Sequence, residues 1–313
     1  MKALRIAFAG TPEFARAALL GVLASPHPVV GVFTRPDRPR GRGRRLAASA
    51  VKEAALAAQL PLSQPVTMRD GAALAELCAW RADLLVVVAY GLILPQAVLD
   101  APRLGSINVH ASLLPRWRGA APIQRALLAG DRDTGITLMR MEARLDAGPI
   151  LLQHPWVIQP SDTARSLHDA LAQLGCRTLL EGLDHLASGR MDGTPQSEEL
   201  ATYAAKITKA EARIDWHLSA SDIERRVRSF NPQPIAETGL GESRLRIFAT
   251  QIYEGPDDPA AAPGTVIAVH GDGAVVQCGE GALTLTQVQR PGRRVVAGRE
   301  FAAEGELVGR LFS

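Results

Sequence analysis

The sequence predicts a doubly wound α/β domain followed by a small β-barrel, and two patterns indicate this. In the first half, short strands that are apolar on both faces alternate with helical segments, which is typical of a mostly parallel, Rossmann-like sheet covered on both sides. In the last third, short β-prone runs alternate with Gly and Pro turns, as in a small antiparallel barrel. We expect a catalytic domain at residues 1–189, a linker at 190–206 and an OB-like domain at 207–313.

The first domain is expected to begin with a strand over residues 4–10. The turn Thr11-Pro12-Glu13 then starts a helix that runs to about Ala24, because proline is favoured in the first turn of a helix. This turn lacks the later glycines of a dinucleotide fingerprint, so nicotinamide binding is disfavoured. We expect further strands at 29–34, 83–90, 106–112 and 135–142, and further helices at 49–59, 71–80, 122–129 and from 162 to about 186.

The second domain is expected from short runs of high β propensity at 245–253, 264–270, 274–278 and 282–288. From Lys206 to Ser313 the 13 basic residues nearly balance the 14 acidic ones. Arginines at 225–228 and 290–299 would still form local basic patches.

Composition indicates an ordinary globular protein, since 47% of the 313 residues are hydrophobic and 21% are charged. The apolar stretch from Leu4 to Ala9 contains Arg5 and is too short for a secretory signal, and residues 84–94 are too few to span a bilayer. We therefore expect a cytoplasmic protein with no membrane contact. The three cysteines are widely separated, which argues against a disulfide framework or a zinc site.

An arginine-rich segment lies between Thr34 and Ala48, where six arginines stand against Asp37 alone. A local concentration of positive charge in a balanced protein favours a polyanionic partner. A solvated loop without a partner is the alternative.

Three polar residues are candidates for catalysis. Asn108 and His110 end an expected strand, and because side chains alternate along a strand they point to the same side. An amide can hold a carbonyl oxygen, and an imidazole can donate to an oxyanion or carry a proton. Asp146 precedes a turn, Ala147-Gly148-Pro149. Structural hydrogen bonding is the alternative for the first two residues, and capping of local amides is the alternative for Asp146.

The residues that follow His110 make a resemblance plain. The run Ser112-Leu113-Leu114-Pro115-Arg116-Trp117-Arg118-Gly119-Ala120-Ala121-Pro122 resembles the motif of the folate-dependent formyltransferases, in the version found in members that formylate methionyl-tRNA. Further similar segments occur in the family's order at 10–15, 35–43, 145–149, 203–207 and 212–216.

The resemblance implies formyl transfer from 10-formyltetrahydrofolate to the α-amine of initiator methionyl-tRNA, for translation initiation. It assigns catalysis to Asn108, His110 and Asp146, and part of the folate-binding loop to Ser112, Leu113, Leu114 and Pro115. It also implies that Arg42, flanked by two glycines, enters the nucleic acid, while the neighbouring arginines bind phosphates: Arg38, Arg40, Arg44 and Arg45.

Formyl transfer of this kind needs neither a metal nor a nucleophile from the enzyme, and we expect neither. We also expect a monomer. Two alternatives stay open from the sequence. The chain is a related formyltransferase that acts on an amino sugar or small amine, or it is a non-catalytic RNA-binding protein built on this scaffold.

Overall fold

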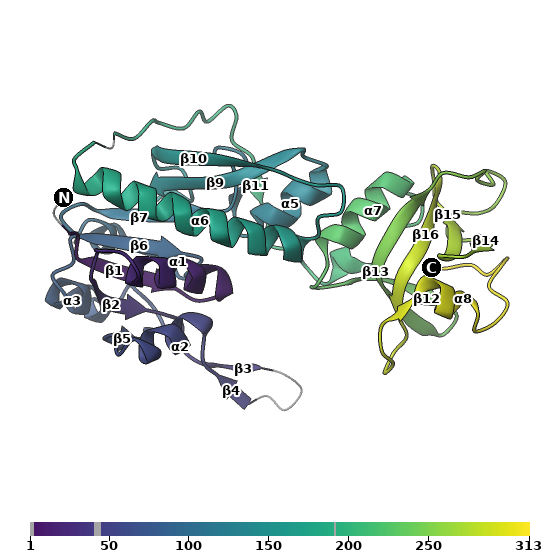
Figure 1. The fold of residues 1–313 in the computed structure, drawn as a ribbon, viewed down its shortest axis with the longest axis horizontal. Helices are drawn as coiled ribbons and strands as arrows, with labels where there is room; N and C mark the ends of the chain where they lie inside the picture. The colour runs from purple at the N-terminus through teal and green to yellow at the C-terminus, as the bar shows by residue number, and fades with distance from the viewer. Residues whose placement is uncertain (1–2, 41–44, 191) are drawn as a thin grey trace. The chain divides into compact units, whose positions relative to one another are not determined.

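The computed structural model describes residues 3–40, 45–190 and 192–313, and the chain divides into two compact units (Figure 1). The first unit consists of Met1–Pro122, Asp133–Val157 and His168–Ala204. The second consists of Ile123–Arg132, Ile158–Leu167 and Ala205–Ser313. Each unit has its own sheet and its own core.

A seven-stranded sheet in the order β10-β9-β7-β6-β1-β2-β5 forms the centre of the first unit. The run from β7 to β5 is parallel, whereas β9 is antiparallel to both of its neighbours. The predicted mostly parallel sheet is therefore confirmed. The strands are β1 (Ile6–Gly10), β2 (Val29–Phe33), β5 (Leu62–Ser63), β6 (Leu84–Val88), β7 (Ser106–His110), β9 (Asp133–Arg140) and β10 (Ile150–Val157).

Helices cover both faces of this sheet. On one face, α3 (Ala72–Ala79) and α4 (Gln96–Leu99) share a buried core with Ala7, Ala9 and Val87 of the strands. On the other face lie α1 (Glu13–Leu23) and the long α6 (Ala164–Ala187). Helix α6 approaches so closely that a Cβ atom at Gly175 would lie 3.1 Å from Cγ1 of Val109. Because Val109 of β7 points towards α6, its neighbours Asn108 and His110 point to the opposite face.

Several short elements complete the first unit. Helix α2 (Ala50–Ala57) follows a hairpin of β3 (Arg38–Arg40) and β4 (Arg45–Ala47). Strand β8 (Arg118–Gly119) pairs in parallel with β11 (Tyr203–Ala204), so part of the stretch predicted as a linker packs against the segment that follows β7.

The second unit is built on an antiparallel sheet in the order β12-β13-β16-β15-β14, with β17 added to β16. Near the carboxyl terminus, Leu311 bridges Thr265 beside β14 and Phe312 bridges Leu240 of β12, so one segment joins the two edges of the sheet into a small barrel. The core includes Phe230, Phe301 and Phe312. The elements are α5 (Pro122–Ala129), η1 (Ala210–Ala212), α7 (Ala220–Ser229), β12 (Ala236–Leu240), β13 (Ser243–Tyr253), β14 (Val266–His270), β15 (Gly273–Gln277), β16 (Ala282–Gln289), β17 (Val296–Ala297) and α8 (Gly298–Ala302).

Candidate active site

Asn108, His110 and Asp146, which we call the polar cluster, meet at the carboxyl end of β7. The Asn108 amide donates to Oδ1 of Asp146 at 3.5 Å, and Nδ1 of His110 lies 3.7 Å from Oδ2 of the same carboxylate. The side chains of His110 and Asp146 are only 7% and 13% exposed. Such burial strengthens electrostatic interactions, so the cluster has the arrangement that charge stabilisation and proton transfer require.

The imidazole of His110 is fixed by a bond to the backbone. Its Nε2 lies 2.8 Å from the carbonyl oxygen of Trp117, and because a carbonyl can only accept, this nitrogen carries a proton. In the neutral ring, Nδ1 therefore has a free lone pair on the side that faces Asp146. His110 is thus set to accept a proton at Nδ1, and it donates from Nδ1 only after that proton has arrived.

The Asp146 carboxylate is also bound by the segment that carries β8. The backbone N–H of Gly119 donates to Oδ2 of Asp146 at 2.8 Å. Both Trp117, with φ of 66°, and Asp146, with φ of 48°, have left-handed backbone conformations that L residues rarely adopt. Strain of this kind persists where the surroundings enforce it, and it is concentrated at functional sites.

Residues 194–204, which we call the strap, enforce this geometry. Gln196 donates from Nε2 to the carbonyl oxygens of Asp146 at 2.9 Å and of Gly148 at 2.7 Å. The hydroxyl of Thr202 accepts from the N–H of Trp117 at 2.9 Å. The strap therefore contacts the turn of Asp146 and the loop that fixes His110.

Arg118 connects the strap to β8. Its side chain is fully buried; Nε donates to Gln196 at 3.0 Å, and the two terminal nitrogens donate to the Glu198 carboxylate at 3.1 Å each. These bonds lower the pKa of Glu198, chiefly through the contact with Arg118. Sequence reasoning missed Arg118, Gln196 and Glu198 as parts of the site, because the partners lie about 80 residues apart and only the fold brings them together.

The predicted folate-binding residues form a tight turn after β7. Ser112 and Leu114 are buried, and the Ser112 hydroxyl donates to the carbonyl of Arg116 at 2.6 Å. Gln153 donates to the carbonyl of Leu114 at 2.8 Å. The polar groups of this turn thus hold its own shape, while Leu113 and Pro115 are half-buried side chains that remain available for contact. Folate binding by Ser112 to Pro115 stays a prediction.

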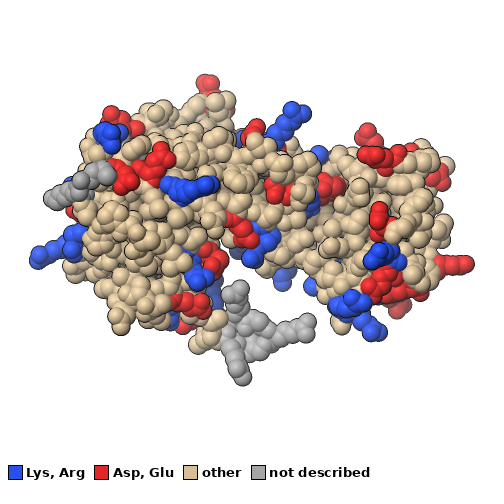
Figure 2. All heavy atoms as spheres, viewed as in Figure 1, with Lys and Arg blue, Asp and Glu red and all other residues tan. Residues whose placement is uncertain are grey.

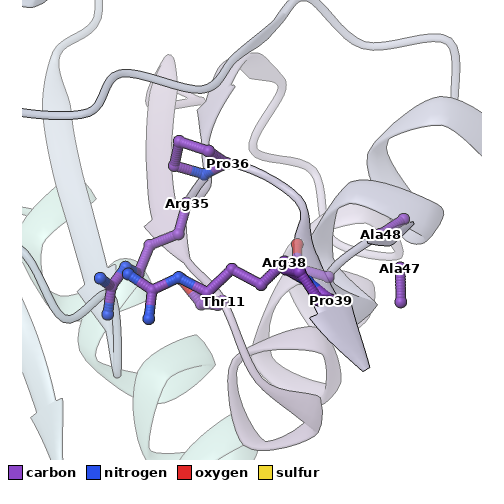
Figure 3. A pocket seen from close by; sticks show the side chains of 8 residues that line it. Thr11, Arg35, Pro36, Arg38, Pro39, Ala47 and Ala48 are labelled. Atoms are coloured by element: carbon purple, nitrogen blue, oxygen red, sulfur yellow. The ribbon is translucent and has the colours of Figure 1, made fainter. Parts of the chain in front are cut away.

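The arginines predicted to bind tRNA lie in and beside the β3–β4 hairpin. Arg38 begins β3 and lines a pocket with Arg35 (Figure 3). Arg40 and Arg45 are backbone partners in the hairpin, while Arg42 and Arg44 lie outside the described residues. The tRNA-binding role of these residues stays a prediction.

Most arginines expected to form patches on the second unit are paired with acids. Arg225 contacts Asp222, Arg228 contacts Glu224, and Arg290 contacts Glu304 at 2.9 Å. On the face drawn in Figure 2, basic and acidic side chains are interspersed. Pairing reduces the charge that these side chains offer to a polyanion.

Neither a membrane-spanning helix nor a metal-binding cluster is present among the described residues. None of the helices at 3–40, 45–190 and 192–313 is long and apolar enough to cross a membrane. Within the same ranges, the His, Cys, Asp and Glu side chains form no cluster of three or more that would hold a metal ion.

The fold and the polar cluster define an α/β enzyme with a carboxyl-terminal barrel, and comparison with known families identifies its class. The model of the formyl transferase family matches residues 4–183, and that of the formyl transferase C-terminal domain matches residues 206–305. This chain belongs to the formyl transferase family, as the motif after β7 predicted.

Curated relatives are similar over nearly the whole chain. Methionyl-tRNA formyltransferase of Pseudomonas fluorescens strain SBW25 is 55% identical, with 98% of each chain covered. Methionyl-tRNA formyltransferase of Methylococcus capsulatus strain Bath is 52% identical, with 98% of this chain and 99% of the relative covered.

Solved structures share the fold at lower sequence identity. An N-formyltransferase from Helicobacter canadensis, in complex with folinic acid and dTDP-3-aminofucose, has a TM-score of 0.69 at 15% identity over 92% of this chain and 99% of its own. HypX from Aquifex aeolicus, in complex with tetrahydrofolic acid, has a TM-score of 0.66 at 17% identity. This chain covers 47% of HypX, which in turn matches 97% of this chain.

Proposed function

We propose that this chain transfers the formyl group of 10-formyltetrahydrofolate to the α-amino group of initiator methionyl-tRNA, the reaction that prepares this tRNA for translation initiation. The observation that carries the proposal is the convergence of Asn108, His110 and Asp146 in a chain more than half identical to a methionyl-tRNA formyltransferase. Tetrahydrofolate in the HypX complex and folinic acid in the Helicobacter complex support a folate as the donor.

In this proposal Asn108 stabilises the charge that develops on the formyl oxygen. Attack by the amine forms a bond to the formyl carbon and places negative charge on that oxygen. The Asn108 Nδ2 group donates to Asp146 only over a long 3.5 Å, so this donor is weakly engaged in the cluster. Exchange of this weak contact for a bond to the oxyanion strengthens an interaction in the transition state only, which is what accelerates a reaction.

Asp146 and His110 move the proton that the amine must lose. Asp146 accepts it directly or through water, and Nδ1 of His110, 3.7 Å away, shares it. Collapse of the intermediate then breaks the bond between the formyl carbon and N10 of the folate, and the same pair returns the proton to N10. Atoms and charge balance, and the enzyme ends unchanged.

Binding of the two substrates is assigned as the motif implies. Ser112, Leu113, Leu114 and Pro115 contribute to the folate site, and the arginines of the β3–β4 segment bind the acceptor end of the tRNA, with Arg42 entering the nucleic acid. We further propose that the chain acts as a monomer in the cytoplasm, and that its functional domains are divided at residues 189 and 207.

A direct assay tests the proposal. The chain is incubated with 10-formyltetrahydrofolate and, separately, with methionylated initiator tRNA, methionylated elongator tRNA, and an amino-sugar nucleotide. We expect formylation of the initiator tRNA at the highest kcat/KM. Exclusive activity on the amino sugar would establish the related formyltransferase instead, and tRNA binding without turnover would establish a non-catalytic protein.

A further inference from the structure

Thr202 of the strap holds the peptide group that faces His110. Its backbone carbonyl accepts from the N–H of Arg118 at 2.9 Å, and its hydroxyl accepts from the N–H of Trp117 at 2.9 Å. Its own N–H donates to the carbonyl of Pro115 at 3.3 Å. One residue therefore fixes two consecutive peptide groups of the segment that leads into β8.

The peptide group between Trp117 and Arg118 is bound at both ends. A trans peptide is planar, and its C=O and N–H bonds point in opposite directions. The N–H of this group points to Thr202, so its carbonyl oxygen points away from the strap and lies 2.8 Å from Nε2 of His110. The strap and the imidazole thus bind the same rigid plane from opposite sides.

The side chain of Thr202 stabilises an unfavourable backbone conformation at Trp117. With φ of 66°, Trp117 lies in the left-handed region, which residues with a Cβ atom rarely adopt. Rotation back to a common conformation would turn the peptide groups on both sides of Trp117. The hydroxyl of Thr202 opposes this rotation, because the rotation would leave the Trp117 N–H without its acceptor.

The orientation of the Trp117 carbonyl decides which nitrogen of His110 carries the proton. A carbonyl beside Nε2 requires a proton there and leaves the lone pair on Nδ1, which faces the Asp146 carboxylate at 3.7 Å. Without that carbonyl the ring would place its proton on Nδ1, because a carboxylate is the stronger acceptor. Nδ1 could then take up no proton, and Oδ2 of Asp146 would accept a second hydrogen bond besides that from Gly119.

The strap lies in neither of the two matched family regions. These regions cover residues 4–183 and 206–305, whereas the strap consists of residues 194–204. Thr202 therefore acts on His110 from a segment that the sequence indicates only as a connection between two domains.

We propose that Thr202 is a positioning residue for formyl transfer, which keeps His110 in the tautomer protonated at Nε2 through the peptide group of Trp117. This inference rests on the proposed function, in which Nδ1 of His110 shares the proton that the amine loses. Thr202 changes none of the bonds that form or break. It determines where the imidazole proton lies before the reaction begins.

Thr202→Val tests this inference, because valine keeps the branched shape of threonine and removes the hydroxyl. A wrong histidine tautomer lowers kcat by about 10⁴-fold in a serine protease. Thr202→Val keeps the backbone bond to Arg118, so we expect a smaller loss of about tenfold in kcat, the effect of one unsatisfied N–H. KM for the folate and for methionyl-tRNA should stay within about twofold of wild type. Thr202→Ser, which keeps the hydroxyl, should restore most of kcat.

Nuclear magnetic resonance of ¹⁵N-labelled histidine measures the tautomer without turnover, because a protonated ring nitrogen and a bare one have different chemical shifts. The chain has seven histidines, and the signals absent from His110→Gln are those of His110. At about pH 8, we expect the proton on Nε2 in wild type and in Thr202→Ser. In Thr202→Val we expect a clear share of the proton on Nδ1.

Thr194→Val is the matched control, because it makes the same change in the same strap. Thr194 pairs through its backbone with Ile150 at the start of β10, and both hydrogen bonds are 2.8 Å long. This variant should keep both the kcat and the tautomer of wild type. If circular dichroism shows that Thr202→Val is unfolded, Thr202→Ala repeats the test with no methyl group in place of the hydroxyl.

Two different failures are distinguishable. A folded variant without the Thr202 hydroxyl in which either kcat or the tautomer stayed as in wild type would overturn the role of Thr202, while formylation of methionyl-tRNA stands. No formylation of methionyl-tRNA by wild type would overturn the proposed function, and the spectra would still decide whether Thr202 sets the tautomer of His110.

Discussion

The geometry of the site makes its most specific prediction for the effect of replacing Arg118 by methionine. The substitution keeps an unbranched apolar stem but removes a fully buried guanidinium with its three hydrogen bonds to Gln196 and Glu198. Glu198 is 51% exposed and can be rehydrated, so the loss is smaller than for a pair buried on both sides. We expect a loss of about 2 kcal/mol in the free energy of unfolding.

The melting temperature should then fall by roughly 4–8 °C, as expected for a chain of this size. Activity should fall too, because Gln196 anchors the turn of Asp146 and a strap without Arg118 holds that turn loosely. We expect kcat to fall about tenfold to a hundredfold, since small displacements of catalytic groups have effects of this size, with KM for the folate nearly unchanged.

The assay is calorimetry together with steady-state kinetics, and Arg144→Met is the matched control. Arg144 contacts the same carboxylate at 2.8 Å but is 65% exposed, and exposed ion pairs contribute little. Its stability and kcat should stay close to those of wild type. If Arg118→Met left both kcat and the melting temperature unchanged, or if Arg144→Met had the same effect, the strap would not position Asp146.

The remaining predictions concern proton transfer, acid stability and thiol reactivity. His110→Ala should lower kcat by about 10²- to 10³-fold with the fold intact, measured by single turnover and circular dichroism; a rate near that of wild type would exclude the role. The pKa of Glu198 is lowered in the folded chain, so the stabilisation that this carboxylate gives is present at neutral pH and is lost as the pH falls through that lowered value. The difference in the free energy of unfolding between wild type and Arg118→Met should therefore shrink in acid. A difference that stayed constant with pH would contradict this. Burial raises the pKa of Cys278 to about 12, whereas Cys78 is exposed. A thiol reagent at pH 8 should therefore label the native chain at Cys78 and reach Cys278 only after unfolding. Peptide mapping of the labelled chain measures this.

The sequence alone predicts those parts of the site that depend on local pattern. Asn108 and His110 share a side because strand side chains alternate, and the buried position of Val109 against α6 agrees with this. Strands β1, β2 and β6 are predictable because each is a continuous apolar run. The sequence does not predict strand β10, because this strand contains Pro155 and several half-exposed residues and so resembles neither a buried strand nor a helix.

The parts that sequence reasoning could not supply are contacts between distant segments. Nothing local in a polar stretch marks Gln196 as the partner of the Asp146 turn, and an arginine within a motif gives no sign that it is fully buried. In the sequence, Arg35 is only one of six arginines in a basic segment. Its place in a pocket becomes apparent when β1, β2 and α2 are assembled.

The central claim is that Asn108, His110 and Asp146 carry out formyl transfer, and Asp146→Asn tests it most directly. The variant keeps the shape of the side chain and can still accept from the Gly119 N–H, but it removes the base. Single-turnover transfer from 10-formyltetrahydrofolate to initiator methionyl-tRNA should slow by about 10²-fold or more while binding of both substrates is retained. Transfer at the wild-type rate would contradict the claim.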